Sequence, residues 1–361
     1  MDNPLLSIVI PTRNRPDCLQ FSVKSALTSF SRMNVEIIIV SNGDSETNDT
    51  KYLSSDQLDR VKLVRSEKRL SMSENWRFGF KFCTGEWINY HGDDDIFLPI
   101  PSDYLGELLL KTDSNGIKFL KYNHQWIKNN PETLKPSVDY FIEKNIKPGP
   151  YKTKLVSIEK KIDWWNIIPR DLPSGAASSF IKRSWLAQID NNNVLFNSIS
   201  PDWYHAAVFA LIEKNYIFVN LPLVSIGSHP RSSIAQMKDK KLFDKEVTNL
   251  SAHGSTELLN KIGNYFPTTW RARIDALIQA KKYVDGTYQI NFEPLVKNSY
   301  QTTPRYVLKV YILQRRNFPE YKKKHLYWCV SNFIKSLLAL FTNKINCQLR
   351  LNKSSKVDII E

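Results

Sequence analysis

Three adjacent carboxylates, Asp93, Asp94 and Asp95, are the residues of this sequence whose type and spacing point most directly to chemistry. They follow a short apolar run, residues 87–90, that we expect to be a buried strand. Like charges this close repel and raise one another's pKa unless a cation lies among them. Oxygen ligands suit Mg²⁺ or Mn²⁺, which bind through one or two carboxylates together with substrate phosphates. The alternative is a solvated acidic turn.

The elements that must position these aspartates form an alternating pattern. Apolar runs at residues 5–10, 35–40, 61–64 and 87–90 predict strands, and residues 17–30 carry a helical pattern. Such alternation predicts a doubly wound α/β sheet covered on both faces, in which ligands bind beyond the carboxyl ends of the strands. The residues that follow those ends are Pro11, Thr12, Arg13, Asn42 and the three aspartates.

Four segments resemble, in this order, family 2 of the bacterial glycosyltransferases, which have the GT-A fold: SIVIPTRNRPDCL, EIIIVSNGDS, SENWRFGFKFCTGEWINYHGDDDIFLP and SPDWYHAAVFAL. The resemblance covers residues 5–235, and its specificity comes from order and spacing. It implies a metal-dependent, inverting transfer of a hexosyl or N-acetylhexosaminyl group from a nucleotide diphosphate donor, with a UDP-sugar favoured. The acceptor it implies is a hydroxyl of a glycan or lipid-linked glycan in the biosynthesis of a surface polysaccharide.

The resemblance assigns the donor site. The loop Pro11, Thr12 and Arg13 and the position of Asn42 bind the nucleobase, although Asn42 stands where the family usually has an acid; an amide still offers a donor and an acceptor. Asp93 contacts the ribose, and Asp94 and Asp95 serve Mn²⁺ or Mg²⁺ and the diphosphate. Many relatives carry an additional acid where Gly92 stands. Asn75 matches an Asn-Trp pair of one branch of the family.

Asp202 matches the family's catalytic base, in the sequence SPDWY before an apolar helix. A sugar hydroxyl attacks an anomeric carbon well only if its proton is removed in the transition state, a contribution on the order of 10²- to 10⁴-fold. The alternative is that Asp202 caps the helix, because an aspartate near a helix start satisfies free backbone N–H groups.

Two further sets of residues are implied by the resemblance. His229 lies in a loop after the apolar run 217–224, where family members place a histidine that ligates the metal or closes over the diphosphate, and Arg231 beside it suits phosphate oxygens. The alternative is an exposed loop. The acceptor side is assigned to Trp164, Trp165, Gly175 and Ala176, with core packing of both tryptophans as the alternative.

Length and charge predict a second region. We expect a catalytic domain over residues 1–235, with nucleotide binding in 1–125 and the acceptor side and base in 126–235, followed by a helical region over 236–361. The chain of 361 residues has a net charge of +14, of which residues 297–361 carry +10.

A basic amphipathic helix is expected in this region. Lys322 to Lys324 precede an apolar stripe that is too short and polar to span a bilayer, which needs about 20 apolar residues. The stripe consists of Leu326, Val330, Phe333, Ile334, Leu337, Leu338 and Phe341. It suits a helix lying on an anionic membrane surface. The alternative is a helix docked on the catalytic domain or on a second subunit of a homo-oligomer.

Other function classes are less well supported. Positive charge alone attracts nucleic acid, but no nucleic-acid motif occurs and the carboxylates would repel that ligand, so we expect none. No GxGxxG and no GxxxxGK[ST] pattern occurs. A non-catalytic nucleotide-sugar-binding protein and a sugar-1-phosphate nucleotidylyltransferase stay open, although the latter lacks its glycine-rich start. Four separated cysteines and an N-terminus that enters a strand at once predict a cytoplasmic protein, peripheral on the inner face of the cytoplasmic membrane.

Overall fold

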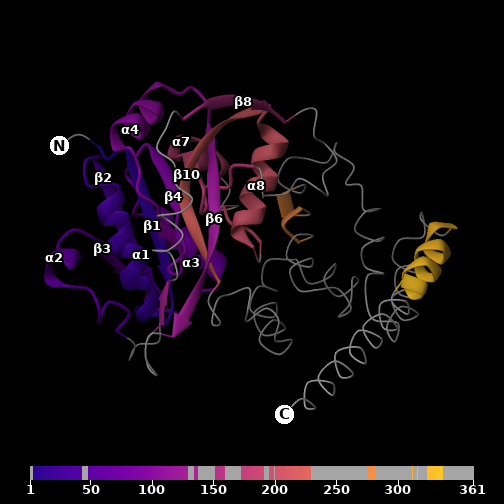
Figure 1. Cartoon of the computed structure of the whole chain (residues 1–361), viewed down its shortest axis with the longest axis horizontal. Coiled ribbons are helices and arrows are strands. Elements are labelled where there is room, and N and C mark those ends of the chain that lie inside the picture. The colour runs from indigo at the N-terminus through magenta and orange to yellow at the C-terminus, as the bar shows by residue number, and fades with distance from the viewer. Residues whose placement is uncertain are drawn as a thin grey trace, which may run out of the picture. The chain divides into compact units, whose positions relative to one another are not determined.

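The computed structural model describes residues 3–42, 48–128, 134–136, 151–158, 172–190, 195–198, 200–228, 275–277, 279–280, 311, 315 and 323–335. The chain divides into two compact units. The first comprises Met1–Thr256 and Thr268–Gln289, and the second comprises Glu257–Pro267 and Ile290–Glu361. The labelled strands and helices all belong to the first unit (Figure 1).

The first unit opens with alternating strands and helices: β1 (Leu6–Thr12), α1 (Pro16–Ser29), β2 (Val35–Ser41), α2 (Ser55–Leu58), β3 (Lys62–Arg65), α3 (Met72–Phe80), β4 (Trp87–Tyr90), β5 (Ile96–Phe97) and α4 (Ser102–Lys111). It continues with β6 (Gly116–Lys128), β7 (Leu134–Pro136), β8 (Thr153–Ser157), β9 (Ser179–Lys182), α7 (Arg183–Asp190), α8 (Pro201–Ile212) and β10 (Asn215–Ser228). The strands and the helix predicted from the N-terminal apolar runs are confirmed, with ends that differ by a residue or two.

One mixed sheet of ten strands organises this unit, in the order β3-β2-β1-β4-β9-β6-β10-β5. The four N-terminal strands β1 to β4 pair in parallel, so their carboxyl ends meet at one edge. Strand β9 is antiparallel to both β4 and β6, and β10 runs parallel to β6. Strands β5 and β8 pair with β10, and β7 pairs with β6. The predicted GT-A-type doubly wound mixed sheet is confirmed.

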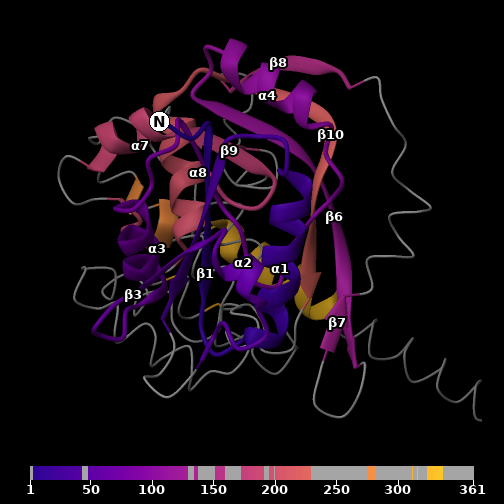
Figure 2. The same ribbon diagram turned by 90° about the vertical axis from the view of Figure 1, so that its left-hand side faces the viewer.

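Helices cover both faces of the sheet (Figure 2). On one face, Leu6, Ile8 and Ile10 of β1 are fully buried in a core that includes α1 residues such as Leu19 and Val23. On the other face, α3 approaches β1 and β2 through Gly79, where an added Cβ would lie 2.9 Å from Val9 and 2.8 Å from Val40. Successive β1 side chains therefore pack against helices on opposite faces of the sheet, as the continuous apolar run predicts.

The helix at residues 323–335 belongs to the second unit and is amphipathic. His325 and Trp328 are buried, whereas the apolar side chains of Leu326, Tyr327, Val330, Phe333 and Ile334 are exposed. In the part of the chain that the structure describes, no helix is long and apolar enough to cross a membrane. The domain boundary expected at residue 235 falls outside the described residues and stays a prediction.

Candidate active site

The aspartates lie at the carboxyl edge of the parallel strands. Strand β1 ends on Thr12, whose Oγ1 donates to Asp93 Oδ2 at 2.7 Å, and Asp93 is fully buried. The chain reaches Asp93 directly after β4, which is the other neighbour of β1 in the sheet besides β2. The predicted meeting of the first loop with the aspartate cluster is therefore present in the structure.

Gly92 allows the aspartate turn to close on itself. Asp95 N donates to Gly92 O at 3.0 Å, and a Cβ added at Gly92 would lie 2.8 Å from Asp95 Oδ2 and 3.2 Å from Asp94 Oδ1. A side chain at this position would therefore displace the carboxylates. The turn is compact because this sequence has glycine here.

Three serines of helix α1 form hydrogen bonds with the backbone of the aspartate turn and of the residues that follow it. Ser22 Oγ donates to Gly92 O at 3.2 Å, Ser25 Oγ accepts from Phe97 N at 3.0 Å, and Ser29 Oγ donates to Leu98 O at 2.9 Å. The spacing of three and four residues puts these hydroxyls on one face of the helix. Sequence analysis missed them, although serines at helical spacing among apolar residues were visible.

The ends of β6 and β10 hold the other side of the turn. Gly227 N donates to Asp95 Oδ1 at 2.9 Å, and Trp126 Nε1 donates to the carbonyl oxygen of Asp94 at 3.0 Å. A Cβ added at Gly227 would collide with that same carbonyl oxygen. The turn is thus built between β4, α1 and the β6–β10 pair.

Arg15, which sequence analysis did not select, lies among the carboxylates. Its guanidinium forms an ion pair with Asp93 Oδ1 and another with Asp94 Oδ2 at 3.2 Å, and its side chain is 14% exposed. Burial lowers the pKa of Arg15, but attraction to Asp93 and Asp94 outweighs this, so the net shift is upward and the side chain stays charged. The signal in the sequence was a basic residue immediately before the first helix.

Burial and repulsion from Asp94 make the Asp93 and Asp95 carboxyls costly to ionise. The pKa of Asp93 is raised to about 7: burial raises it most, the Arg15 charge lowers it, and the Asp94 charge raises it. Burial likewise raises the pKa of Asp95 to about 7, with the Asp94 charge adding to the shift. A divalent cation would reverse this effect, because a nearby positive charge favours the ionised form.

The three aspartates fit Mg²⁺ or Mn²⁺ by donor type, and Asp93 and Asp95 are buried carboxyls that a cation would stabilise. Within the described residues, no group of three or more His, Cys, Asp or Glu side chains converges on one point. An open oxygen site of one or two carboxylates is what these ions use when a substrate phosphate completes the coordination. The residues therefore fit a metal that binds together with a phosphate ligand.

Two asparagines lie beside the end of β2. Asn42 pairs in both directions with the backbone of Leu70: its Nδ2 donates to the Leu70 oxygen at 2.8 Å and its Oδ1 accepts from the Leu70 nitrogen at 2.9 Å. Asn75, in the first turns of α3, donates from Nδ2 to Val40 O at 3.5 Å. Asn75 is buried, and its Oδ1 has no hydrogen-bond partner within the described residues. Asn75 therefore has a free acceptor, whereas Asn42 already orders a loop.

Gly175 and Ala176 extend the β4 edge. Tyr90 N donates to Gly175 O at 2.6 Å, and Tyr90 O accepts from Ala177 N at 2.9 Å. Gly175 has a φ of +68°, which favours glycine. Trp76 stacks on Tyr90 with ring centroids 4.4 Å apart, so Trp76 is a packing residue.

Asp202 is in the first turn of α8. Ser200 Oγ donates to Asp202 Oδ1 at 2.8 Å, and burial raises the pKa of the Asp202 carboxyl. The segment leading to it is tied to α3 by Arg77 Nε, which donates to Leu195 O at 2.9 Å. Ser198 Oγ donates to the buried Asp275 at 2.7 Å. These contacts hold the start of α8, and with it Asp202, in place.

For the other predicted site residues, the structure gives burial alone or no description. Pro11 and Arg13 are half-buried around the end of β1, beside Thr12. Four predicted site residues lie outside the described residues: Trp164, Trp165, His229 and Arg231.

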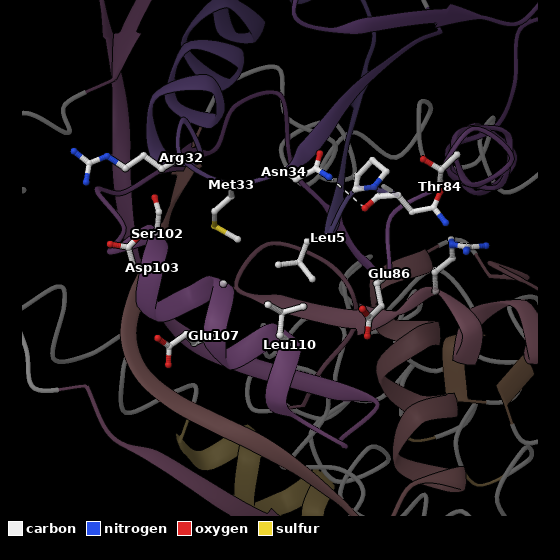
Figure 3. A pocket seen from close by; sticks show the side chains of 14 residues that line it. Leu5, Arg32, Met33, Asn34, Thr84, Glu86, Ser102, Asp103, Glu107 and Leu110 are labelled. Atoms are coloured by element: carbon white, nitrogen blue, oxygen red, sulfur yellow. Dashed lines mark hydrogen bonds between the residues drawn. The ribbon is translucent and has the colours of Figure 1, made fainter. Parts of the chain in front are cut away.

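A separate open pocket of about 760 Å³ lies at the opposite edge of the sheet (Figure 3). Its lining includes Leu5, Asn34 and Glu86, which stand just before β1, β2 and β4. The pocket therefore lies at the amino ends of these strands, whereas the aspartates follow the carboxyl end of β4.

The strand order and the aspartates at the carboxyl ends of the parallel strands define an α/β protein with a mixed sheet. Residues 7–164 match the profile of glycosyl transferase family 2. The match includes the first three of the four segments, so the resemblance that these three carry is confirmed.

Two relatives illustrate the similarity. The chain is 28% identical over 131 residues to the Escherichia coli UDP-Glc:alpha-D-GlcNAc-diphosphoundecaprenol beta-1,3-glucosyltransferase WfgD, a match covering 36% of this chain and 49% of that protein. It is 26% identical over 111 residues to an uncharacterised glycosyltransferase of Rickettsia felis, a match covering 31% of this chain and 18% of that protein. The matches thus span half or less of the relatives' length.

Among solved structures, the chain is similar to S. aureus TarS in complex with UDP, with 11% identity and a TM-score of 0.45 over 94% of this chain and 91% of that one. It is also similar to TarS in complex with UDP-GlcNAc, with 10% identity and a TM-score of 0.42 over 94% and 92% of the two chains.

Proposed function

We propose that this protein transfers a sugar, with inversion, from a nucleotide diphosphate donor to a hydroxyl of a glycan or lipid-linked glycan. The observation that carries the proposal is the cluster Asp93, Asp94 and Asp95 at the carboxyl edge of a family 2 domain, with two of the three carboxyls buried. The relative WfgD is named for transfer from UDP-Glc to a diphosphoundecaprenol-linked sugar. That name favours a UDP-sugar donor and a role in surface polysaccharide biosynthesis.

In the proposed donor site, Asp94 and Asp95 hold Mn²⁺ or Mg²⁺, and Asp93 contacts the ribose. The metal, when bound, neutralises the charge that develops on the leaving diphosphate. Pro11, Thr12, Arg13 and Asn42 surround the nucleobase, and Asn75 offers its free Oδ1 to a ligand N–H. His229 and Arg231 are assigned to the diphosphate side. The acceptor side is assigned to Trp164, Trp165, Gly175 and Ala176.

Asp202 is the proposed base. Its carboxylate accepts the proton of the acceptor hydroxyl as that oxygen bonds to the anomeric carbon and the bond to the diphosphate breaks. Its raised pKa supports this role, because a base works best when its pKa lies nearer the operating pH. The contact with Ser200 orients one carboxylate oxygen.

We further propose that the protein works on the inner face of the cytoplasmic membrane. Support comes from the exposed apolar side of the helix 323–335 and from the lysines at its start, Lys323 and Lys324, which are also exposed. Exposed apolar area beside basic residues suits an anionic lipid surface.

A transfer assay with UDP-sugars, Mn²⁺ and an undecaprenyl-diphosphate-linked sugar tests the proposal. Asp202→Asn should lower turnover about 10²-fold or more and leave donor binding intact, because the amide keeps the shape but cannot accept the proton. Asp103→Asn is the matched control, since Asp103 is also the acid in the first turn of a helix, α4. Near wild-type turnover in Asp202→Asn would identify Asp202 as a helix cap.

A further inference from the structure

Arg15 is held in one place by the chain on both sides of it. Asn14 has a left-handed φ of 54°, and its amide donates to Asp49 Oδ1 at 2.9 Å. Asp49 is buried and also accepts from Ser41 Oγ at 2.7 Å. Pro16 opens α1 directly after Arg15. The guanidinium is therefore presented to the aspartates by a fixed loop.

The guanidinium occupies an oxygen of Asp94, one of the two proposed metal ligands. It pairs with Asp93 Oδ1 and Asp94 Oδ2, so a cation lies among these carboxylates. A divalent ion at Asp94 would be repelled by the guanidinium at short range. Metal binding to the ligand-free protein must therefore displace Arg15 or accept weaker coordination.

A diphosphate removes this conflict. Phosphate oxygens suit the planar set of donors that a guanidinium presents, so a diphosphate gives Arg15 a second anionic partner beside the cluster. It also adds oxygen ligands and negative charge for the metal. Each ligand thus favours the other, and such coupling is reciprocal.

We propose that Arg15 is a built-in counter-cation that keeps a divalent metal from binding tightly to Asp94 until a nucleoside diphosphate is present. The inference rests on the proposed function, because it assumes that the aspartates bind a metal and a diphosphate. It makes Arg15 a residue that sets the order and coupling of ligand binding.

The test measures Mn²⁺ affinity of the nucleotide-free protein by electron paramagnetic resonance, and UDP affinity by calorimetry in Mn²⁺ and in EDTA. Arg15→Gln should bind Mn²⁺ about 10-fold tighter than wild type without UDP, because the competing charge is gone. The factor by which Mn²⁺ tightens UDP binding should shrink in the same variant. Arg15→Lys keeps the charge and should stay within about 3-fold of wild type for Mn²⁺.

Arg32→Gln is the control, because Arg32 lines the pocket at the opposite edge of the sheet and carries the same charge (Figure 3). It should bind Mn²⁺ and UDP as wild type does. Arg15→Met, which keeps the aliphatic length, replaces Arg15→Gln if the latter does not fold. Unchanged or weaker Mn²⁺ affinity in the neutral variants, with UDP binding intact, overturns the inference alone. If no protein binds UDP, the proposed function fails and the inference fails with it.

Discussion

At the scale of single residues, the site is a balance between buried acids and the cations that neutralise them. Asp93 and Asp95 are buried, and Arg15 contacts Asp93 and Asp94. Asp95 instead accepts a backbone hydrogen bond from Gly227. The cost of ionising Asp95 is therefore offset only in part by neutral donors.

This cost predicts a pH-dependent stability. The pKa of Asp95 is about 7 in the folded protein and about 4 in an unfolded chain, so the folded state binds more protons between these values. The stability that Asp95 contributes should therefore fall as pH rises from about 4 to 7. In EDTA, Asp95→Asn should melt several degrees above wild type at pH 8 and close to wild type at pH 5.

The difference between variant and wild type isolates this effect from other groups. Buried His91, His124 and His205 have lowered pKa values and add a pH dependence of opposite sign, but both proteins share it. Asp56→Asn, at an exposed position of α2, should show no such trend. Saturating Mn²⁺ should raise the melting temperature of wild type more than that of Asp95→Asn. A variant that is less stable than wild type at every pH would contradict the interpretation.

At the scale of elements, the aspartate turn depends on contacts from segments far away in the sequence. Helix α1 supports it through Ser22, Ser25 and Ser29, and the ends of β6 and β10 contact it through Trp126 and Gly227. Strand β10 must come very close to the turn, and only glycine permits that approach. Pairing of β10 with β6 is thus coupled to the geometry of the aspartate turn.

Replacing Gly227 tests this coupling. Gly227→Ala should move the end of β10 away from Asp94 and break the hydrogen bond to Asp95, because the new Cβ collides with backbone. We expect UDP affinity in Mn²⁺ to fall about 10-fold or more, consistent with loss of one charge-assisted hydrogen bond and of the turn geometry. Calorimetry measures this affinity directly.

Gly106→Ala is the matched control for Gly227→Ala. Gly106 lies within α4, and a Cβ added there meets nothing within 4 Å. It should raise stability by about 0.5–1 kcal/mol, since alanine is the better helix former, and leave UDP binding unchanged. Wild-type UDP affinity in Gly227→Ala would show that β10 does not control the turn.

At the scale of the whole molecule, the sequence predicts those parts of the fold that depend on a local pattern of residues. The runs 5–10, 35–40 and 87–90 predict parallel strands because each is continuous and apolar, and the aspartates are adjacent in the chain. Contacts between distant segments were not predicted, including the insertion of β9 between β4 and β6. They depend on strand pairing, which periodicity does not specify.

Individual side chains show the same limit. The position of Asn42 at the end of β2 was predictable, but its pairing with the backbone of Leu70 was not, because the loop that returns Leu70 has no regular pattern. Arg15 was visible as a basic residue before α1. Its ion pairs required the turn after β1, with Asn14 at positive φ, which the sequence does not reveal.

The largest-scale prediction concerns the helix 323–335 and an anionic membrane. Leu326 and Ile334 are 58% and 51% exposed, and Lys323 and Lys324 add positive charge at the start of the helix. Each basic residue near an anionic surface contributes about 1 kcal/mol, and the apolar side chains add an area-dependent term. Full-length protein should therefore sediment with anionic vesicles and much less with neutral ones.

Two double variants separate the two contributions to vesicle binding. Lys323→Gln with Lys324→Gln should weaken binding to anionic vesicles about 5- to 30-fold, and high salt should reduce wild-type binding in the same way, because salt screens exposed charges. Leu326→Ser with Ile334→Ser should weaken binding at every salt concentration. Leu155→Ser, at an exposed leucine of β8, is the control and should bind as wild type. Equal sedimentation of wild type with neutral and anionic vesicles would rule out the electrostatic contribution, and an equal loss in the control would rule out a specific role for this helix.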